Sequence, residues 1–193
     1  MPFLSANAAK SIEPTPGYLT PGKIEPGKSV RFALLQKEPL EFYEVWATSP
    51  DGKASKAFRF DFEPTTEDVL AECGDFAPRE YDNRPGCPQV KFSIAVPIYN
   101  YATSGVQVLQ LTQVTIIREL DGVSQMEDYS DLLAVDFTLS RKGSGKESEY
   151  KLLPVPRKKG SDEAIQEAWQ AAQAAGFDLG RMLTGGNPFK PGA

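Results

Sequence analysis

The absence of histidine is the strongest chemical constraint in this chain. Without imidazole, neither the Ser-His-Asp and Cys-His triads nor the usual zinc and non-haem iron sites can form. The two cysteines, Cys73 and Cys87, would supply only half of a tetrahedral zinc site, and we expect free thiols. The phosphate loop, GxGxxG, HExxH and GxSxG motifs are also absent. We therefore expect no metal site, no cofactor and no enzymatic activity.

Carboxylates are the remaining groups that could perform chemistry. Eight acids against one arginine lie between Asp61 and Asp82, and a second acidic stretch runs from Glu119 to Asp136. A magnesium-dependent nuclease would need two or three of these carboxylates in one pocket. Most of them fall in expected loops or near a helix start, where acids are solvated or complement the helix dipole. We therefore favour a non-catalytic reading of the acids.

Basic residues are concentrated in one part of an otherwise acidic chain. The chain has 21 basic and 26 acidic residues, a formal net charge of −5. Between Arg141 and Lys159 there are seven basic residues and two acids, a local net charge of 7 − 2 = +5. Such a surface can hold a phosphate backbone while the rest of the protein repels it.

Basic and aromatic residues also alternate along the early predicted strands. Single-stranded nucleic acid is bound by this mixture, because bases stack on exposed rings while lysine and arginine follow the phosphates. In a strand, however, every second side chain faces the core, so half or more of these rings are expected to be packing residues. We assign base stacking to Trp46, Tyr99 and Tyr101. We assign phosphate contacts to Arg31, Lys56, Arg59, Arg141, Lys142, Lys146 and Lys151.

Strands must position most of these residues. Strand-like segments are expected at 30–35, 42–48, 56–62, 90–101, 106–120, 134–141 and 149–155. Ser49-Pro50-Asp51-Gly52 predicts a hairpin turn, and 142–146 predicts a second one. Residues 65–74 predict a short helix between strands three and four, with Thr65 as N-cap, Asp68 completing a capping box and Gly74 ending it. Residues 75–89 are expected to be a loop.

The chain divides into four expected parts. Residues 1–28, rich in proline and glycine, predict an extended arm, and residues 29–158 a core domain. Residues 159–176 predict an amphipathic helix, because Ile165, Trp169 and Ala172 recur at helical spacing. Residues 177–193 predict a flexible tail. The expected fold is mainly β, an antiparallel barrel of oligonucleotide-binding (OB) type with one internal and one C-terminal helix, whose second and third strands bind single strands.

The strand patterns resemble the small single-stranded DNA-binding proteins of tailed bacteriophages. The resemblance covers about residues 28–157 and is carried by residues 91–101 (KFSIAVPIYNY), 106–111 (VQVLQL), 135–143 (VDFTLSRKG) and 149–156 (EYKLLPVP). It implies an OB fold, binding of single-stranded DNA without sequence preference in phage replication, recombination or repair, and no catalysis. The acidic tail typical of the family is missing, since Asp178 is the only acid among residues 177–193.

Two other function classes stay open beside single-stranded DNA binding. The same β domain and the 161–176 helix could serve a structural or assembly protein of a virion or scaffold, and the acids could serve a nuclease. Replication proteins are further expected partners, through the C-terminal helix or tail. No apolar run approaches membrane-spanning length and no secretion signal is visible, so we expect no membrane contact and a cytoplasmic location, the host cytoplasm if the gene is a phage gene.

Overall fold

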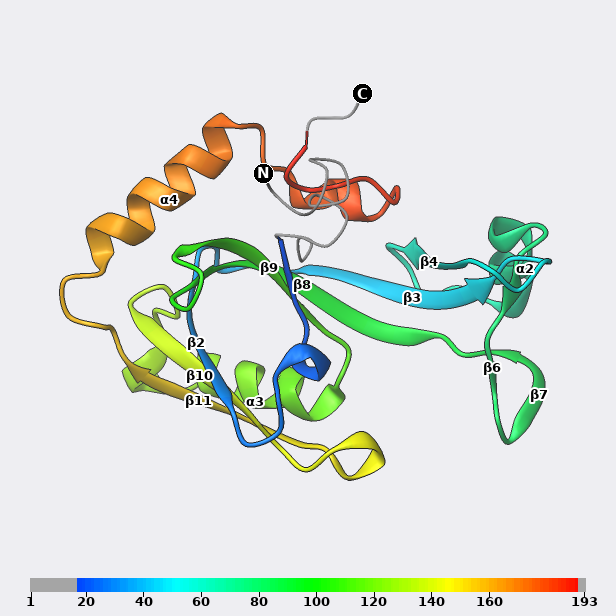
Figure 1. Cartoon of the computed structure of the whole chain (residues 1–193), viewed down its shortest axis with the longest axis horizontal. Helices are drawn as coiled ribbons and strands as arrows, with labels where there is room; N and C mark the ends of the chain where they lie inside the picture. Colours follow the sequence, from blue (N-terminus) through cyan, green and yellow to red (C-terminus); the bar gives the residue numbers. More distant parts are fainter. Residues whose placement is uncertain (1–16, 191–193) are drawn as a thin grey trace, which may run out of the picture.

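A computed structural model describes residues 17–190 of the chain, which form an α/β structure around one large sheet (Figure 1). The nine strands of this sheet are β1 (Tyr18–Leu19), β2 (Ser29–Leu34), β3 (Leu40–Thr48), β4 (Ser55–Phe60), β5 (Ala77–Pro78), β8 (Lys91–Asn100), β9 (Gly105–Leu111), β10 (Val135–Lys142) and β11 (Glu149–Pro156). Two short strands, β6 (Glu80–Tyr81) and β7 (Arg84–Pro88), pair separately. The helices are α2 (Thr66–Cys73), α3 (Val114–Ser124) and α4 (Asp162–Ala174).

The prediction of a mainly β fold with an antiparallel barrel of OB type is wrong. The described strands form an open, mixed sheet in the order β1-β9-β8-β2-β10-β11, and β1 pairs with β9 in parallel. Strand β8 is long enough to pair with β3 along its first half and with β2 along its second half. Strands β3 and β4, together with the first half of β8, therefore lie away from β2, β10 and β11, and β4, α2, β6 and β7 gather at that far end (Figure 1).

Most predicted strands and both predicted hairpins are present. The turn after β3 closes with a hydrogen bond from Gly52 N to Ser49 O at 2.9 Å, and Gly52 adopts a φ of 72° that glycine tolerates. Strands β10 and β11 pair from Val135↔Pro156 to Lys142↔Glu149. Three short strands, β5, β6 and β7, lie in the stretch predicted to be a loop.

The second half of the predicted strand 106–120 is a helix instead. Strand β9 ends at Leu111 and α3 begins at Val114. Ile116, Leu120 and Val123 recur at i, i+4 and i+7 and pack against the sheet. The β-branched residues of this segment favoured the strand prediction, but burial of one apolar face decides in favour of the helix.

The two predicted helices are confirmed. Thr65 Oγ1 accepts a hydrogen bond from Asp68 N, and the Asp68 carboxylate accepts one from Thr65 N at 2.8 Å, so the capping box of α2 is complete. The Thr65 hydroxyl also donates to Asp68 Oδ2 at 2.7 Å, and this bond, followed by the one from Thr65 N, lowers the pKa of Asp68 below its usual value. Helix α4 covers residues 162–174 and buries Ile165.

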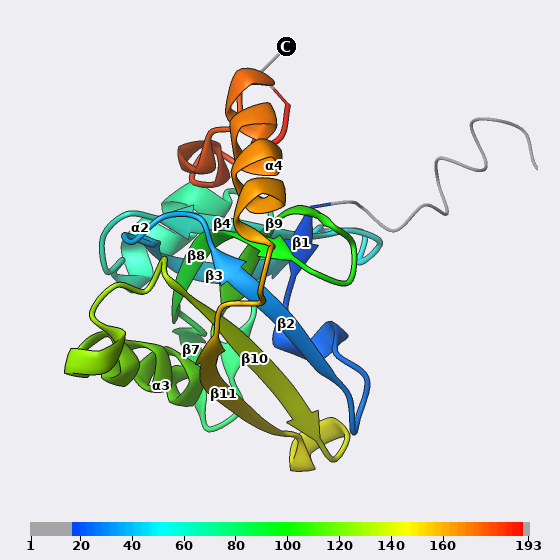
Figure 2. The same cartoon turned by 90° about the vertical axis from the view of Figure 1, so that its left-hand side faces the viewer.

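Helices and turns cover the two faces of the sheet differently. On one face, α3 packs on a core that includes Phe32, Ile98, Phe137 and Leu139. On the other face, Ile165 of α4 packs with Ala33, Leu35 and Tyr99. Figure 2 shows α4 at the top of the view, above β2, β10 and β11, and α3 at the lower left, beside β10 and β11.

Residues 177–190, within the stretch predicted as a flexible tail, fold back onto the sheet. Leu179 and Met182 of the 3-10 helix η4 (Leu179–Met182) are buried against Phe42, Ala95 and Val108. Arg181 holds the segment together, because its Nη1 donates to the carbonyl oxygens of Gly176, Pro188 and Lys190 at 2.7, 3.4 and 3.2 Å. Residues 1–16 of the predicted arm lie outside the described residues. The division into four parts stays a prediction.

Candidate nucleic-acid interface

All three arginines predicted to contact phosphate form ion pairs or hydrogen bonds with other parts of the protein. Arg31 pairs with Asp136, Arg59 pairs with Glu44, and Arg141 donates to backbone carbonyls. The exposed fractions of the Arg31 and Arg59 side chains are 37% and 15%. Arg59 and Arg141 are therefore structural residues, whereas Arg31 keeps part of its guanidinium at the surface.

Asp136 is the centre of a buried cluster that joins β10, β2 and the start of α4. Its Oδ2 accepts from Arg31 Nε at 2.8 Å and from Lys158 N at 3.0 Å. Its Oδ1 accepts from the Tyr101 hydroxyl at 3.0 Å and lies 2.9 Å from Arg157 Nε. Two cations and two further donors thus balance a carboxylate that is completely buried.

A second buried carboxylate, Glu44 on β3, accepts hydrogen bonds from three side chains at the far end of the sheet, away from Asp136. Its Oε2 accepts from Arg59 Nε and Gln110 Nε2, both at 3.0 Å, and its Oε1 accepts from Trp46 Nε1 at 2.9 Å. Arg59 also donates to the carbonyl oxygen of Met182 at 3.2 Å. Arg59 is therefore a link between β4 and the C-terminal segment, and its predicted role as a phosphate contact is not supported.

Arg141 anchors the loop before β2. Its Nη1 donates to the carbonyl oxygens of Gly22 and Ile24 at 2.8 and 2.9 Å, and its Nη2 donates to Ser148 Oγ at 3.0 Å. These partners hold residues 22–24 against the β10–β11 hairpin. The guanidinium is half-buried and already carries three acceptors, so it is poorly placed to bind a phosphate.

The three aromatic residues predicted to stack on bases have different exposures. Tyr99 is 6% exposed and packs under α4, which leaves its ring no free face. Tyr101 is half-buried, with Arg31 and Lys158 within 5.5 and 5.4 Å of its ring centre. Burial, more than its contact with Asp136, raises the pKa of the Tyr101 hydroxyl. Trp46 alone of the three is exposed, at 40%.

The predicted lysines all lie at the surface, but at two ends of the molecule. Lys142, Lys146 and Lys151 belong to the β10–β11 hairpin. Lys56 lies on β4, opposite Ala47, so its side chain and that of Trp46 project from opposite faces of the β3–β4 hairpin. The Nζ of Lys56 instead lies 4.5 Å from the ring centre of Phe58.

The strand register places several polar and basic residues on one face of β2, β10 and β11, which we call the hairpin face. Thr138 pairs with Arg31 and Leu153, while Ser140 pairs with Ser29 and Lys151. Directly paired residues share a face, whereas their neighbours Phe32, Phe137 and Leu152 face the core on the α3 side. The hairpin face consists of Ser29, Arg31, Thr138, Ser140, Lys142, Glu149, Lys151 and Leu153, so one exposed acid, Glu149, lies directly opposite Lys142.

This face is open to solvent. Lys142 and Lys151 are exposed, Leu153 is 44% exposed, and Figure 2 shows β2, β10 and β11 side by side below α4. A recess of about 520 Å³ runs from Lys142 and Lys151 over the edge of β11 to Glu119 of α3. Glu119 accepts a hydrogen bond from Leu152 N at 2.7 Å, which occupies a backbone donor of this edge strand.

Sequence reasoning missed the residues that orient this surface. Asp136 and Lys158 were not among the predicted DNA contacts, and Asp136 was considered only as an acid of the nuclease alternative; it shares the strand face of Thr138 and Ser140. An acid on the polar face of an alternating strand is expected to be exposed, so the sequence carries no signal that Asp136 is buried. Its partners are 105 residues away for Arg31 and 21 residues away for Arg157, so the pattern cannot identify them.

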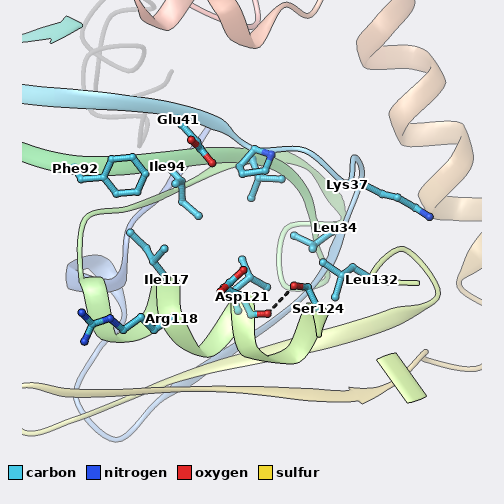
Figure 3. Close-up of a pocket in the computed structure, with 13 residues that line it drawn as sticks. Leu34, Lys37, Glu41, Phe92, Ile94, Ile117, Arg118, Asp121, Ser124 and Leu132 are labelled. Atoms are coloured by element: carbon cyan, nitrogen blue, oxygen red, sulfur yellow. Dashed lines mark hydrogen bonds between the residues drawn. The ribbon is translucent and has the colours of Figure 1, made fainter. Parts of the chain in front are cut away.

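A separate apolar cavity of about 350 Å³ lies between α3 and the opposite face of the sheet (Figure 3). Leu34, Ile94, Ile117 and Leu132 line it, and the charged side chains of Lys37, Glu41, Arg118 and Asp121 stand around it. Lys37 forms an ion pair with Asp131 at 3.1 Å, which lowers the pKa of Asp131. None of the predicted site residues lines this cavity.

The acids of residues 17–190 lie apart from one another in the positions considered for a metal-dependent nuclease. Within residues 17–190, no three histidine, cysteine, aspartate or glutamate side chains are placed to hold a metal ion. Asp61, considered above for a nuclease, is exposed, while Asp136 is buried among arginines. In the described part of the chain, no helix is long and apolar enough to cross a membrane. The chain matches no protein-family model, no curated protein and no solved structure.

Proposed function

We propose that the protein binds single-stranded DNA without sequence preference, on the hairpin face. The observation that carries this proposal is the one-sided placement of Arg31, Lys142 and Lys151 on three adjacent strands, with hydroxyl groups and Leu153 between them. Cations on adjacent strands can pair with successive phosphates of a nucleic-acid backbone, and an apolar side chain between them can pack against the face of a base.

The Asp136 cluster supports this use of the sheet. Arg31 is held by Asp136 and by the carbonyl oxygen of Pro156, to which its Nη2 donates at 2.7 Å. Its guanidinium is thus fixed before DNA arrives, and less side-chain entropy is lost on binding. Lys146 at the hairpin tip adds a fourth positive charge beside the hairpin face.

The biological setting rests on the resemblance to phage proteins described above. A role in phage DNA replication, recombination or repair, without catalysis and in the host cytoplasm, is the setting that this resemblance suggests. The resemblance no longer extends to the fold, because the sheet is open and mixed. The proposal therefore depends on the hairpin face and not on the barrel.

The test is a titration of a labelled oligo(dT) by fluorescence anisotropy at several salt concentrations. The three exposed lysines, Lys142, Lys146 and Lys151, would each neutralise one phosphate and predict a slope of log K against log[salt] of about −2, at about 0.7 per phosphate. Replacing Lys142 and Lys151 together by alanine should reduce the magnitude of the slope by about 1.4. The double variant Lys37→Ala/Lys53→Ala, at two exposed lysines that are neither predicted contacts nor part of the hairpin face, is the matched control and should bind as the unaltered protein does.

Three results would contradict the proposal: no binding at low salt, equal binding of a duplex, or an unchanged slope in the Lys142/Lys151 variant. A single large assembly whose size does not respond to DNA would instead favour the structural or assembly protein considered in the sequence analysis.

A further inference from the structure

Trp46 is an exposed aromatic residue in a strand that is otherwise mostly buried. Its neighbours Val45 and Ala47 are completely buried, while 40% of Trp46 is accessible to solvent. Ala57 lies directly opposite Trp46 on β4, and its methyl group is too small to cover the indole. Part of the indole ring is therefore accessible from solvent.

The indole is held in place from two sides. Its Nε1 donates to Glu44 Oε1, and Glu44 is itself fixed by Arg59 and Gln110. Arg79 donates its backbone N–H to Trp46 O at 2.8 Å, and its guanidinium carbon lies 5.9 Å from the ring centre. A ring that is exposed yet fixed, with a cation beside it, is preorganised for stacking with a nucleobase.

Trp46 and the hairpin face belong to the same face of the large sheet. Phe42 pairs with Ser93 on β8, and Ala33 pairs with Tyr99 on β8 and with Asp136 on β10. Because residues two apart share a face, Trp46 on β3 and Arg31 on β2 project to the same side. The surface between them is covered by η4, packed on Phe42, and by α4, packed on Tyr99.

We infer that Trp46, positioned by Glu44 and flanked by Arg79, is a second, base-stacking subsite for the same single strand, separate from the hairpin face. This inference rests on the proposed function. It adds that only a strand long enough to pass the C-terminal segment reaches both subsites. The exposed acids of α4, Asp162, Glu163 and Glu167, disfavour phosphate contacts along the way.

The register gives the length that the strand must have. Trp46 is six residues from Leu40, which pairs with Ala95, and Ala95 is six residues from Tyr101, which donates to Arg31 O. Twelve residues at about 3.3 Å each correspond to about 40 Å along the sheet. At about 3.4 Å per nucleotide of stacked strand, this distance takes about 12 nucleotides.

The experiment compares oligo(dT) of about 6 and about 24 nucleotides on variants of the full chain. Trp46→Ala should weaken binding of the long oligonucleotide about five-fold or more and leave that of the short one unchanged, because stacking contributes only where the strand reaches Trp46. The slope of log K against log[salt] should not change, since no cation is removed. In Trp169→Phe, where Trp46 is the only tryptophan, the long oligonucleotide alone should quench the fluorescence.

Trp46→Phe is the second variant, because it keeps an aromatic ring and should retain part of the long-oligonucleotide affinity even though its hydrogen bond to Glu44 is lost. The inference is overturned if Trp46→Ala binds both lengths as the unaltered protein does, or if it weakens both equally. In either case the Lys142/Lys151 variant still reports on the hairpin face, so the proposed function can stand while the second subsite fails. An unaltered protein that binds neither oligonucleotide overturns both.

Discussion

Arg31 Nη2 lies 2.7 Å from Asp136 Oδ2, across two neighbouring strands and between residues 105 positions apart in the chain. The carboxylate is completely buried, whereas the arginine side chain keeps 37% of its surface exposed. The pair therefore joins the interior to the hairpin face. Its loss should affect both the stability of the fold and the placement of a cation on that face.

Asp136→Asn should lower the free energy of unfolding by about 3–5 kcal/mol, because it leaves Arg31 and Arg157 without their buried counter-charge. Urea denaturation followed by circular dichroism measures the change. Asp131→Asn is the matched control, since its pair with Lys37 is exposed on both sides and should contribute little to stability. Equal midpoints for the two variants would show that the Asp136 cluster does not hold the sheet together.

The hydroxyl of Tyr101 should lose its proton at a higher pH than an ordinary tyrosine hydroxyl does. Burial raises the pKa of its hydroxyl, so the folded state favours the protonated form. The corresponding stability is present below the pKa of the unfolded chain, at about 10, and is lost as pH rises through the higher pKa of the folded state.

Tyrosinate absorbance against pH checks this behaviour. Tyr101→Phe should remove one group that titrates at raised pH, and Tyr18→Phe should remove a second one, because burial also raises the pKa of Tyr18. A titration of Tyr101→Phe that superimposes on that of the unaltered protein would be inconsistent with the buried hydroxyl.

Met182→Ala tests whether residues 177–190 belong to the folded unit. Met182 is completely buried against the sheet, so its truncation should cost about 2–5 kcal/mol of stability. Met126→Ala, at a residue that is 51% exposed, should change stability little and serves as the control. If the segment were detached in solution, the two variants would unfold at the same urea concentration.

Gly143→Ala should destabilise the β10–β11 hairpin more than Gly52→Ala destabilises the β3–β4 hairpin. Both glycines have positive φ, 67° and 72°, which costs about 1–2 kcal/mol for an alanine. At Gly143 a Cβ would also collide with the backbone carbonyl of Glu147, whereas no atom lies near the corresponding position at Gly52. Thermal unfolding of the two variants should differ accordingly, and identical melting temperatures would contradict the turn geometry.

Local structure was the part of this fold that could be predicted from residues alone. The capping box of Thr65 and Asp68, the turn at Gly52 and the β10–β11 pair depend on neighbours in the chain, and all three are present. The α3 segment was predicted wrongly because Val114, Ile116 and Ile117 have strand propensity. Only the burial of its apolar face on the sheet makes it helical.

The candidate site shows the same division between near and distant neighbours. The sequence by itself determined that the chain lacks imidazole chemistry, that its positive charge gathers at residues 141–159, and that these residues form a hairpin. The tertiary structure alone decided which cations remain available. Arg59 and Arg141 are bound to Glu44 and to backbone carbonyls, while Lys142 and Lys151 stay exposed.

The strand order likewise came only from the tertiary structure. Alternating patterns identify strands, but they do not determine that β8 pairs with β3 and β2 along one edge, or that β1 joins β9 in parallel and leaves the sheet open. The physical reason is that pairing partners and buried counter-charges are chosen by contacts between residues far apart in sequence. The free energy of those contacts depends on burial, which no local pattern of residues specifies.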